Sequence, residues 1–187
     1  MAHIEYSHDA YKISGDLNGR KVFLHRDFCA ECQGPFTEVQ PEAKLSVPIK
    51  LDYSMSRDGA HMCSQAFVDL CSEEGFTGSK FLNVGCGQFV IRPTRAVLVD
   101  DVQLGRTELK TCRTCGRARD VVIGNMHPRI LPNELTIGPR ELVRSKQEYG
   151  HVTMRHFFVF VGKEAAAILA ESDLKGMAFN YLSPQAG

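Results

Sequence analysis

Two pairs of cysteines, each with the pattern Cys-x-x-Cys, place the strongest constraint on how this chain can fold. The first pair is Cys29 and Cys32, in DFCAECQG, and the second is Cys112 and Cys115, in CRTCGR. Two-residue spacing lets one tight turn present two thiolates, and zinc takes four such ligands at tetrahedral corners about 2.3 Å away. The sequence therefore predicts one structural Zn²⁺ site, with Cys29, Cys32, Cys112 and Cys115 as its ligands.

The separation between the pairs shapes this prediction. Positions 33 to 111, a run of 79 residues, lie between them, whereas a compact zinc ribbon has about 15–20 residues there. We therefore predict a split zinc knuckle, a zinc-ribbon-like element formed by residues 27–35 and 110–118 that joins the N-terminal and central segments. Free or redox-active thiols are the alternative, but neither pair opens a helix as a redox Cys-x-x-Cys would.

Length and composition are those of one ordinary globular domain. The chain has 187 residues, of which 43% are hydrophobic and 24% charged, so we expect a single domain over residues 1–187. The N-terminus has neither the cationic start nor the apolar core of an export signal, and the longest apolar runs, such as FFVFV at 157–161, are far too short to span a membrane. We expect a cytoplasmic protein whose seven cysteines are reduced thiols or metal ligands.

The charge balance is neutral, with 22 basic and 22 acidic residues. A nucleic-acid-binding protein usually carries a basic excess, so neutrality weighs against that class. The segment from Arg106 to Arg119 is nevertheless locally basic. These cations could contact nucleic acid, or they could offset the net charge of about −2 on a zinc centre with four thiolates.

The pattern of apolar residues and turn signals predicts an α+β fold, with a mixed or antiparallel sheet and few helices. Residues 61–75 and 163–174 have helical periodicity, which would place Cys63 and Cys71 in the core and bury Ala166, Ala167, Ile168, Leu169 and Leu174 at least in part. The segment 132–150 is ambiguous and suggests one or two helical turns among loops. Extended segments are expected at 43–53, in a hairpin around 14–20, and in strands at 21–28, 80–84, 88–91, 95–100, 119–124, 155–162 and 177–182.

No catalytic constellation stands out, and we predict no enzyme. His61 lies at the start of a core-facing helix, and His151 and His156 are an odd number of residues apart on an extended segment, which separates their faces. GCGQFV at 85–90 lacks the third glycine of a dinucleotide fingerprint and is better explained as a turn.

The chain resembles the double-CxxCG-motif proteins of bacteria, part of which are immunity proteins to contact-delivered polymorphic toxins. The resemblance rests on DFCAECQG (27–34), the long insertion, CRTCGR (112–117) and the ending FFVFVGKEAAAILAESDLKGMAFNYL (157–182). It departs at Gln33, where the motif has glycine. The resemblance implies a protein that binds and occludes a cognate toxin domain, with no small-molecule substrate and no membrane partner. A zinc-ribbon nucleic-acid-binding or regulatory protein is the alternative.

Overall fold

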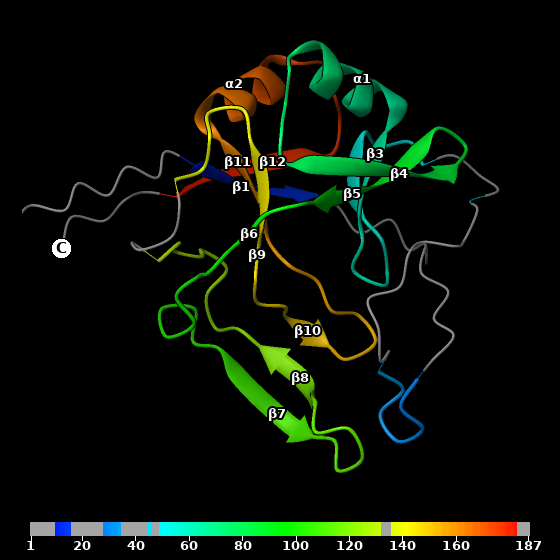
Figure 1. Cartoon of the computed structure of the whole chain (residues 1–187), viewed down its shortest axis with the longest axis vertical. Coiled ribbons are helices and arrows are strands. Elements are labelled where there is room, and N and C mark those ends of the chain that lie inside the picture. Colours follow the sequence, from blue (N-terminus) through cyan, green and yellow to red (C-terminus); the bar gives the residue numbers. More distant parts are fainter. Residues whose placement is uncertain (1–9, 16–27, 35–44, 46–48, 132–135, 183–187) are drawn as a thin grey trace, which may run out of the picture.

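A computed structural model describes the fold for residues 10–15, 28–34, 45, 49–131 and 136–182 (Figure 1). Within these ranges two helices accompany twelve strands, which confirms the expected α+β class. The helices are α1 (Gln65–Glu73) and α2 (Lys163–Glu171). The strands are β1 (Ala10–Gly15), β2 (Tyr53–Met55), β3 (His61–Ser64), β4 (Ser79–Gly85), β5 (Gln88–Pro93), β6 (Ala96–Val97), β7 (Thr107–Thr111), β8 (Ala118–Val122), β9 (Leu142–Ser145), β10 (Gly150–His151), β11 (Val159–Gly162) and β12 (Met177–Leu182).

The largest sheet has five strands in the order β12-β1-β11-β9-β6. Strand β1 is antiparallel to both β11 and β12, so the connection β11–α2–β12 ends parallel to its start, with β1 between the two strands. Strands β6 and β9 are parallel, which makes the sheet mixed, as predicted. The predicted strand, helix and strand over 155–182 are also confirmed, with a shorter first strand and a helix that ends at Glu171.

A second sheet, with the order β2-β3-β5-β4, lies beside the first. Both helices lie on the same side of these sheets (Figure 1). Strands β4 and β5 form a hairpin, and the turn expected at GCGQFV joins them, with Cys86 and Gly87 at its tip. Both turn residues have positive φ, as a two-residue hairpin turn that follows the twist of its strands requires.

The predicted helix at 61–75 begins four residues too early. Residues His61–Ser64 form β3, which pairs with β2 and β5, and the Ser64 hydroxyl accepts a hydrogen bond from the Phe67 N–H to cap α1. His61, Met62 and Cys63 are all buried, because this strand is covered on both faces. Periodicity alone does not distinguish a short apolar strand that is buried on both faces from a buried helical segment, and this explains the error.

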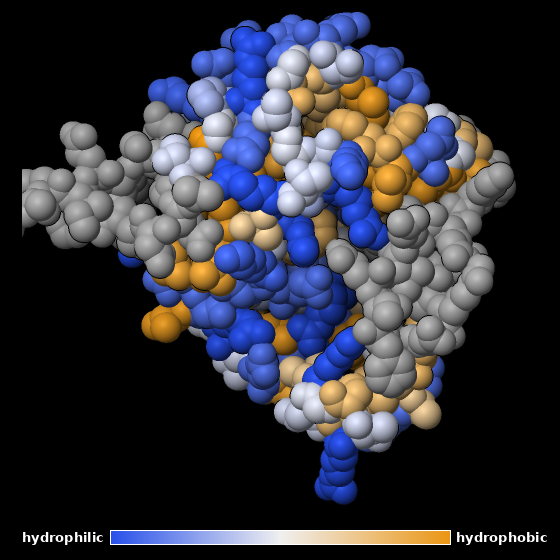
Figure 2. Space-filling view, in the orientation of Figure 1, coloured by the Kyte–Doolittle hydropathy of each residue, from blue (hydrophilic) through white to orange (hydrophobic). Residues whose placement is uncertain are grey.

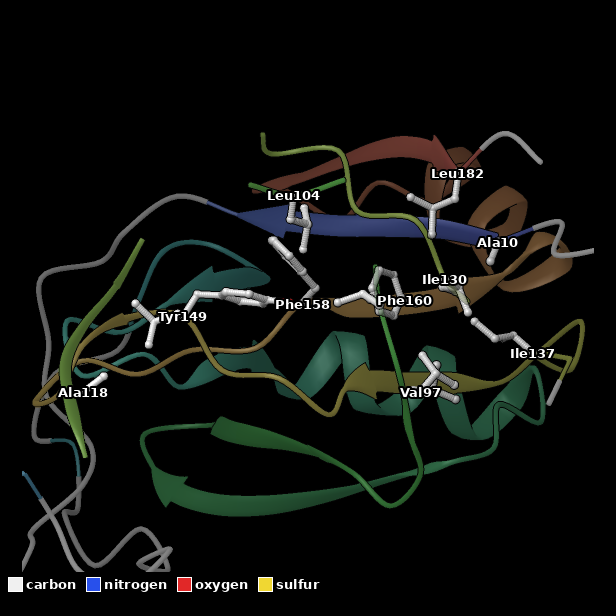
Figure 3. Packing of buried hydrophobic residues seen from close by; sticks show 13 residues of the cluster. Ala10, Val97, Leu104, Ala118, Ile130, Ile137, Tyr149, Phe158, Phe160 and Leu182 are labelled. Carbon is white, nitrogen blue, oxygen red and sulfur yellow. The ribbon is translucent and has the colours of Figure 1, made fainter. Parts of the chain in front are cut away.

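Hydrophobic cores lie on both faces of the five-stranded sheet. One contains Ile13, Val159 and Val161, and it packs against both helices. The other contains Ala10 and the rings of Phe158, Phe160 and Tyr149, which lie in a row beneath β1 (Figure 3). Strand β11 is therefore buried on both sides, as expected for a continuous apolar run.

The predicted burial of α2 is mostly confirmed. Ala166 and Leu169 are buried, and Ile168 and Leu174 are partly buried. Ala167 is exposed, contrary to the prediction, because the buried stripe runs through Ala165, Ala166 and Leu169.

The third sheet, β10-β8-β7, lies at the opposite end of the molecule from the helices (Figure 1). Strand β8 was expected, but β7 was not, because all five of its residues are exposed and give no apolar pattern. The helical turns expected at 132–150 are wrong for the described residues 136–150, which contain β9 and the start of β10. Residues 21–27 of the predicted strand at 21–28, and residues 43–44 and 46–48 of the extended segment 43–53, lie outside the described residues; of the described part of 43–53, only Tyr53 belongs to a strand, β2. None of the described helices is long and apolar enough to span a membrane.

A buried hydrogen-bonded histidine links the second sheet to the segment that leads into β11. His61 Nε2 lies 2.8 Å from the Phe157 carbonyl oxygen and must therefore carry the proton, which leaves Nδ1 to accept from the Tyr53 hydroxyl at 2.8 Å. Burial lowers the pKa of His61 to about 4. The imidazole is consequently a neutral core group that binds two neighbours and has no capacity left for a metal.

We predict that His61 stays neutral, as the Nε2–H tautomer, throughout pH 5–8. Because its folded pKa lies below the unfolded value, stability due to the neutral ring is fully present above about pH 6.5 and declines as pH falls toward 4. NMR of the ring nitrogens and carbons measures both tautomer and pKa. Half-protonation near pH 6.5 in the folded protein would contradict the assignment.

Candidate metal centre

The structure brings the four predicted cysteines together. The Sγ atoms of Cys29, Cys32, Cys112 and Cys115 all lie within 4.8 Å of one another, a group that could hold a metal ion. The Sγ atoms of Cys29 and Cys112 are 3.7 Å apart, as are those of Cys32 and Cys115. Each short pair joins one cysteine from each motif, so the site connects two segments that are distant in sequence.

Two loops with the same backbone pattern present these thiols. In the second cysteine loop (112–117), which joins β7 to β8, the Cys112 N–H donates to the Arg117 carbonyl and the Gly116 N–H donates to the Cys112 carbonyl. In the first cysteine loop (29–34), the Cys29 N–H donates to the Gly34 carbonyl and the Gln33 N–H donates to the Cys29 carbonyl. The two loops therefore have equivalent hydrogen bonds at equivalent positions.

This equivalence explains the departure at Gln33 from the expected glycine. Gly116 has a φ of 71°, and Gln33, at the matching position, has a φ of 57°. Gln33 thus adopts a left-handed conformation that costs a non-glycine residue about 1 kcal/mol or more. Gly34 is needed for another reason, because a Cβ atom there would overlap the Val152 side chain and would lie 3.3 Å from the Cys32 sulfur.

Glu31, between the cysteines of the first loop, binds the second loop. Its carboxylate accepts hydrogen bonds from the Thr114 hydroxyl at 2.8 Å and the Thr114 N–H at 3.2 Å, and it pairs with Arg119 at 2.7 Å. The Thr114 hydroxyl, the Cys112 thiol and the Arg119 guanidinium together lower the pKa of Glu31 to about 2. The sequence did not single out Glu31. The available signal was an acidic residue inside the first cysteine motif together with several arginines around the second motif.

The thiols differ in their readiness to ionise. Backbone N–H groups, first that of Cys32 and then that of Glu31, stabilise the Cys29 thiolate and lower its pKa to about 7 against the effect of burial. The N–H of Cys115 favours the Cys112 thiolate in the same way, but burial and the adjacent thiols raise the pKa of Cys112 to about 12. The Cys112 Sγ also lies 3.4 Å from a Glu31 carboxylate oxygen and donates a hydrogen bond to it when the thiol is protonated.

The arrangement fits a tetrahedral thiolate-binding metal. Sulfur atoms at the corners of a tetrahedron about 2.3 Å from zinc are roughly 3.8 Å apart, close to the two 3.7 Å distances. Cys29 and Cys112 are completely buried, and Val152 packs against the group. Four sulfur ligands fill a tetrahedral shell, so such a centre would connect chain segments and would leave no position for a substrate.

The basic residues near the second loop fall into two groups. Arg119 pairs with Glu31, and Arg106 pairs with Glu108 at 2.5 Å and lies 3.8 Å from an Asp101 oxygen. Their charges are therefore largely offset by carboxylates. Other cations, Lys110, Arg113 and Arg117, are exposed on β7 and the second loop.

The other residues singled out from the sequence lie elsewhere. Cys63 and Cys71 are buried in the core, as predicted, and burial raises the pKa of Cys71 to about 12. Cys86 is exposed at the β4–β5 turn. His151 lies on β10 with its Nδ1 2.8 Å from the Thr153 hydroxyl, while the backbone of His156 pairs with that of Tyr149, so the two histidines do not form a ligand pair.

Comparison of the chain with protein-family models, curated proteins and solved structures finds no match to any of the three. The resemblance to the double-CxxCG-motif proteins thus rests on the sequence motifs themselves and stays a prediction.

We predict opposite effects of substitution at the two matching left-handed positions. Gln33→Gly should stabilise the protein by about 0.5 kcal/mol, because relief of backbone strain exceeds the added flexibility of the unfolded chain, whereas Gly116→Ala should destabilise it by about 1 kcal/mol. Chemical denaturation of the metal-loaded protein measures both. Gln33→Ala is the matched control and should change stability little; equal gains for the alanine and glycine variants would contradict the conformational explanation.

Proposed function

We propose that the four-cysteine group binds one structural Zn²⁺ and that this ion connects the first and second cysteine loops as a split zinc knuckle. The observation that carries the proposal is the convergence of four thiols, from two loops with equivalent backbone hydrogen bonds, at a spacing near that of tetrahedral zinc. When bound, zinc would be coordinated by the four thiolates and would thereby cross-link the two loops. Glu31 would then hold the second loop through Thr114 and Arg119, outside the ligand set.

Zinc at this site should contribute strongly to stability. A link between residues 29 and 112 closes a long loop, and a covalent link over such a loop removes about 4 kcal/mol of chain entropy from the unfolded state. We predict one zinc per chain, and a melting temperature that falls by roughly 10 °C in Cys112→Ser or after treatment with a strong chelator.

Elemental analysis and calorimetry measure the two quantities. Cys86→Ser is the matched control, because Cys86 is exposed and outside the site, and it should keep both the zinc and the melting temperature. Protein without bound metal that melts unchanged in Cys112→Ser would contradict the zinc proposal and favour free or redox thiols.

We further propose that the protein is a cytoplasmic immunity protein that binds and occludes a cognate bacterial toxin domain. The sequence resemblance supports this role, and the distribution of exposed apolar side chains supports protein binding. Of the seven large apolar side chains exposed among the described residues, six lie in or beside the cysteine loops and the β7–β8 hairpin: Phe28, Val102, Leu109, Val122, Met126 and Met154. Hydrophobic residues are visible among hydrophilic ones at this end of the molecule (Figure 2).

The outer face of the β7–β8 hairpin is the centre of this distribution. Thr107 lies opposite Val122, and Leu109 opposite Asp120, so alternation places Leu109 and Val122 on one face. Their exposed fractions are 41% and 45%. Apolar side chains with arginines at the rim are typical of protein–protein interfaces, and Arg113 and Arg117 lie at the adjacent loop.

Co-expression with candidate toxins, beginning with the product of the neighbouring gene, tests the immunity role. We expect protection from one toxin and a stable complex with it, and we expect Leu109→Asp combined with Val122→Asp to weaken the complex at least about tenfold. Ala170→Asp, on the exposed side of α2, is the control and should bind as the wild type does. Absence of binding and protection would contradict the proposal.

A zinc-ribbon nucleic-acid-binding or regulatory protein is the second candidate, favoured by the exposed Lys110, Arg113 and Arg117 beside the second loop. Binding to phosphates would weaken steeply with salt. Titration of duplex DNA and single-stranded RNA at increasing salt separates the two candidates. Salt-dependent affinity that Arg113→Glu removes would favour nucleic acid, and no affinity at physiological salt would exclude it.

A further inference from the structure

Most edge strands of the described sheets carry features that discourage pairing with another strand. Strands β6 and β10 have only two residues each, and β2 has three, with the Tyr53 N–H donating to the Lys175 carbonyl. Strand β4 has Lys80 and a shift of register between Asn83 and Gly85. Very short strands, lysines and bulges are the usual means by which proteins protect sheet edges.

Strand β7 is protected in the same way. It carries Glu108 and Lys110, and its pairing with β8 is interrupted at Lys110, between the pairs Leu109–Asp120 and Thr111–Ala118. Lys110 has a φ of 53°, so the backbone departs from an extended strand at that point.

Strand β12 has none of these features. Its six residues, MAFNYL, contain no charge, proline or glycine, and all six pair with β1 in one unbroken register from Gly15–Met177 to Ala10–Leu182. Within the described part of the chain, no strand pairs with the other edge of β12. Every second residue of such a strand directs its N–H and C=O groups away from β1, where a further strand could bind them.

We propose that β12 is an interface between two copies of this chain, which pair antiparallel through their β12 edges about a twofold axis normal to the sheet. The two five-stranded sheets would then form one continuous sheet. The axis would pass near Phe179 and Asn180, the midpoint of the strand. This association goes beyond the proposed toxin-binding role. It would use the edge of the five-stranded sheet formed by β12, and β6 forms the other edge.

The side chains of β12 are compatible with a second copy of the same strand. Met177, Phe179 and Tyr181 alternate along one face, and Tyr181 packs on Tyr11 with ring centroids 5.1 Å apart. About an axis normal to the sheet the same faces of both copies point the same way, so this apolar row would continue across the interface. Because the strand is uncharged, self-pairing brings no like charges together, and no charge selects a different partner.

Sedimentation velocity of the zinc-loaded full chain tests the proposal. We expect the mass to rise with concentration from 20.8 kDa to twice that value, over roughly 1–100 µM. Ala178→Lys combined with Tyr181→Lys, both at exposed positions, should weaken the dimer at least about tenfold by protecting the edge. The control, Leu109→Lys combined with Val122→Lys, makes the same change on the β7–β8 hairpin and should dimerise as the wild type does.

Hydrogen exchange of the wild-type protein provides a second measurement that needs no variant. Amides within 177–182 should exchange more slowly at high protein concentration than at low concentration, while those of β7 should not change. A wild-type chain that is monomeric at every concentration, a dimer that survives the β12 substitutions, or equal weakening by the control would each overturn the proposal. None of these results depends on a toxin, so the dimer and the immunity role fail or stand separately.

Discussion

The pairing of β1 on both of its edges is the constraint on which the rest of the structure depends. Strand β1 lies close to the start of the chain, and it pairs with β11 and β12, which lie close to the end of the chain. Without β1, neither the β11–α2–β12 unit nor the sheet that separates the two hydrophobic cores would be complete. Alternation along β1 places Ile13 in the core beneath the helices and Ala10 in the core on the other face.

The cysteine group performs a similar joining role at the other end of the molecule. The three-stranded sheet is small, and all five residues of β7 are exposed, so apolar burial within it is limited. The first cysteine loop, Glu31 and Val152 add contacts on its inner side. A metal centre would strengthen this junction because it replaces weak contacts between separate segments with four bonds to one ion.

These two regions divide the surface into parts of different character. Exposed apolar side chains concentrate around the cysteine loops and the β7–β8 hairpin, whereas β12 presents an uncharged edge on the largest sheet. The proposed toxin-binding face and the proposed dimer edge therefore belong to different sheets, and both could be used at the same time. Local arginines pair with Glu31, Asp101 and Glu108, which reduces the positive field that nucleic acid would require.

The sequence by itself determined the four-cysteine group and most of the regular elements, because cysteine spacing and strong apolar periodicity are local signals. It identified Cys29, Cys32, Cys112 and Cys115, the α+β class and the strand, helix and strand at the C-terminal end. Tertiary structure decided what depends on distant contacts. It converted residues 61–64 into a strand covered on both faces, formed β7 from a segment with no apolar pattern, and placed Glu31 against Thr114 and Arg119. These features arise from pairing between segments far apart in the chain, whose free energy no local pattern records.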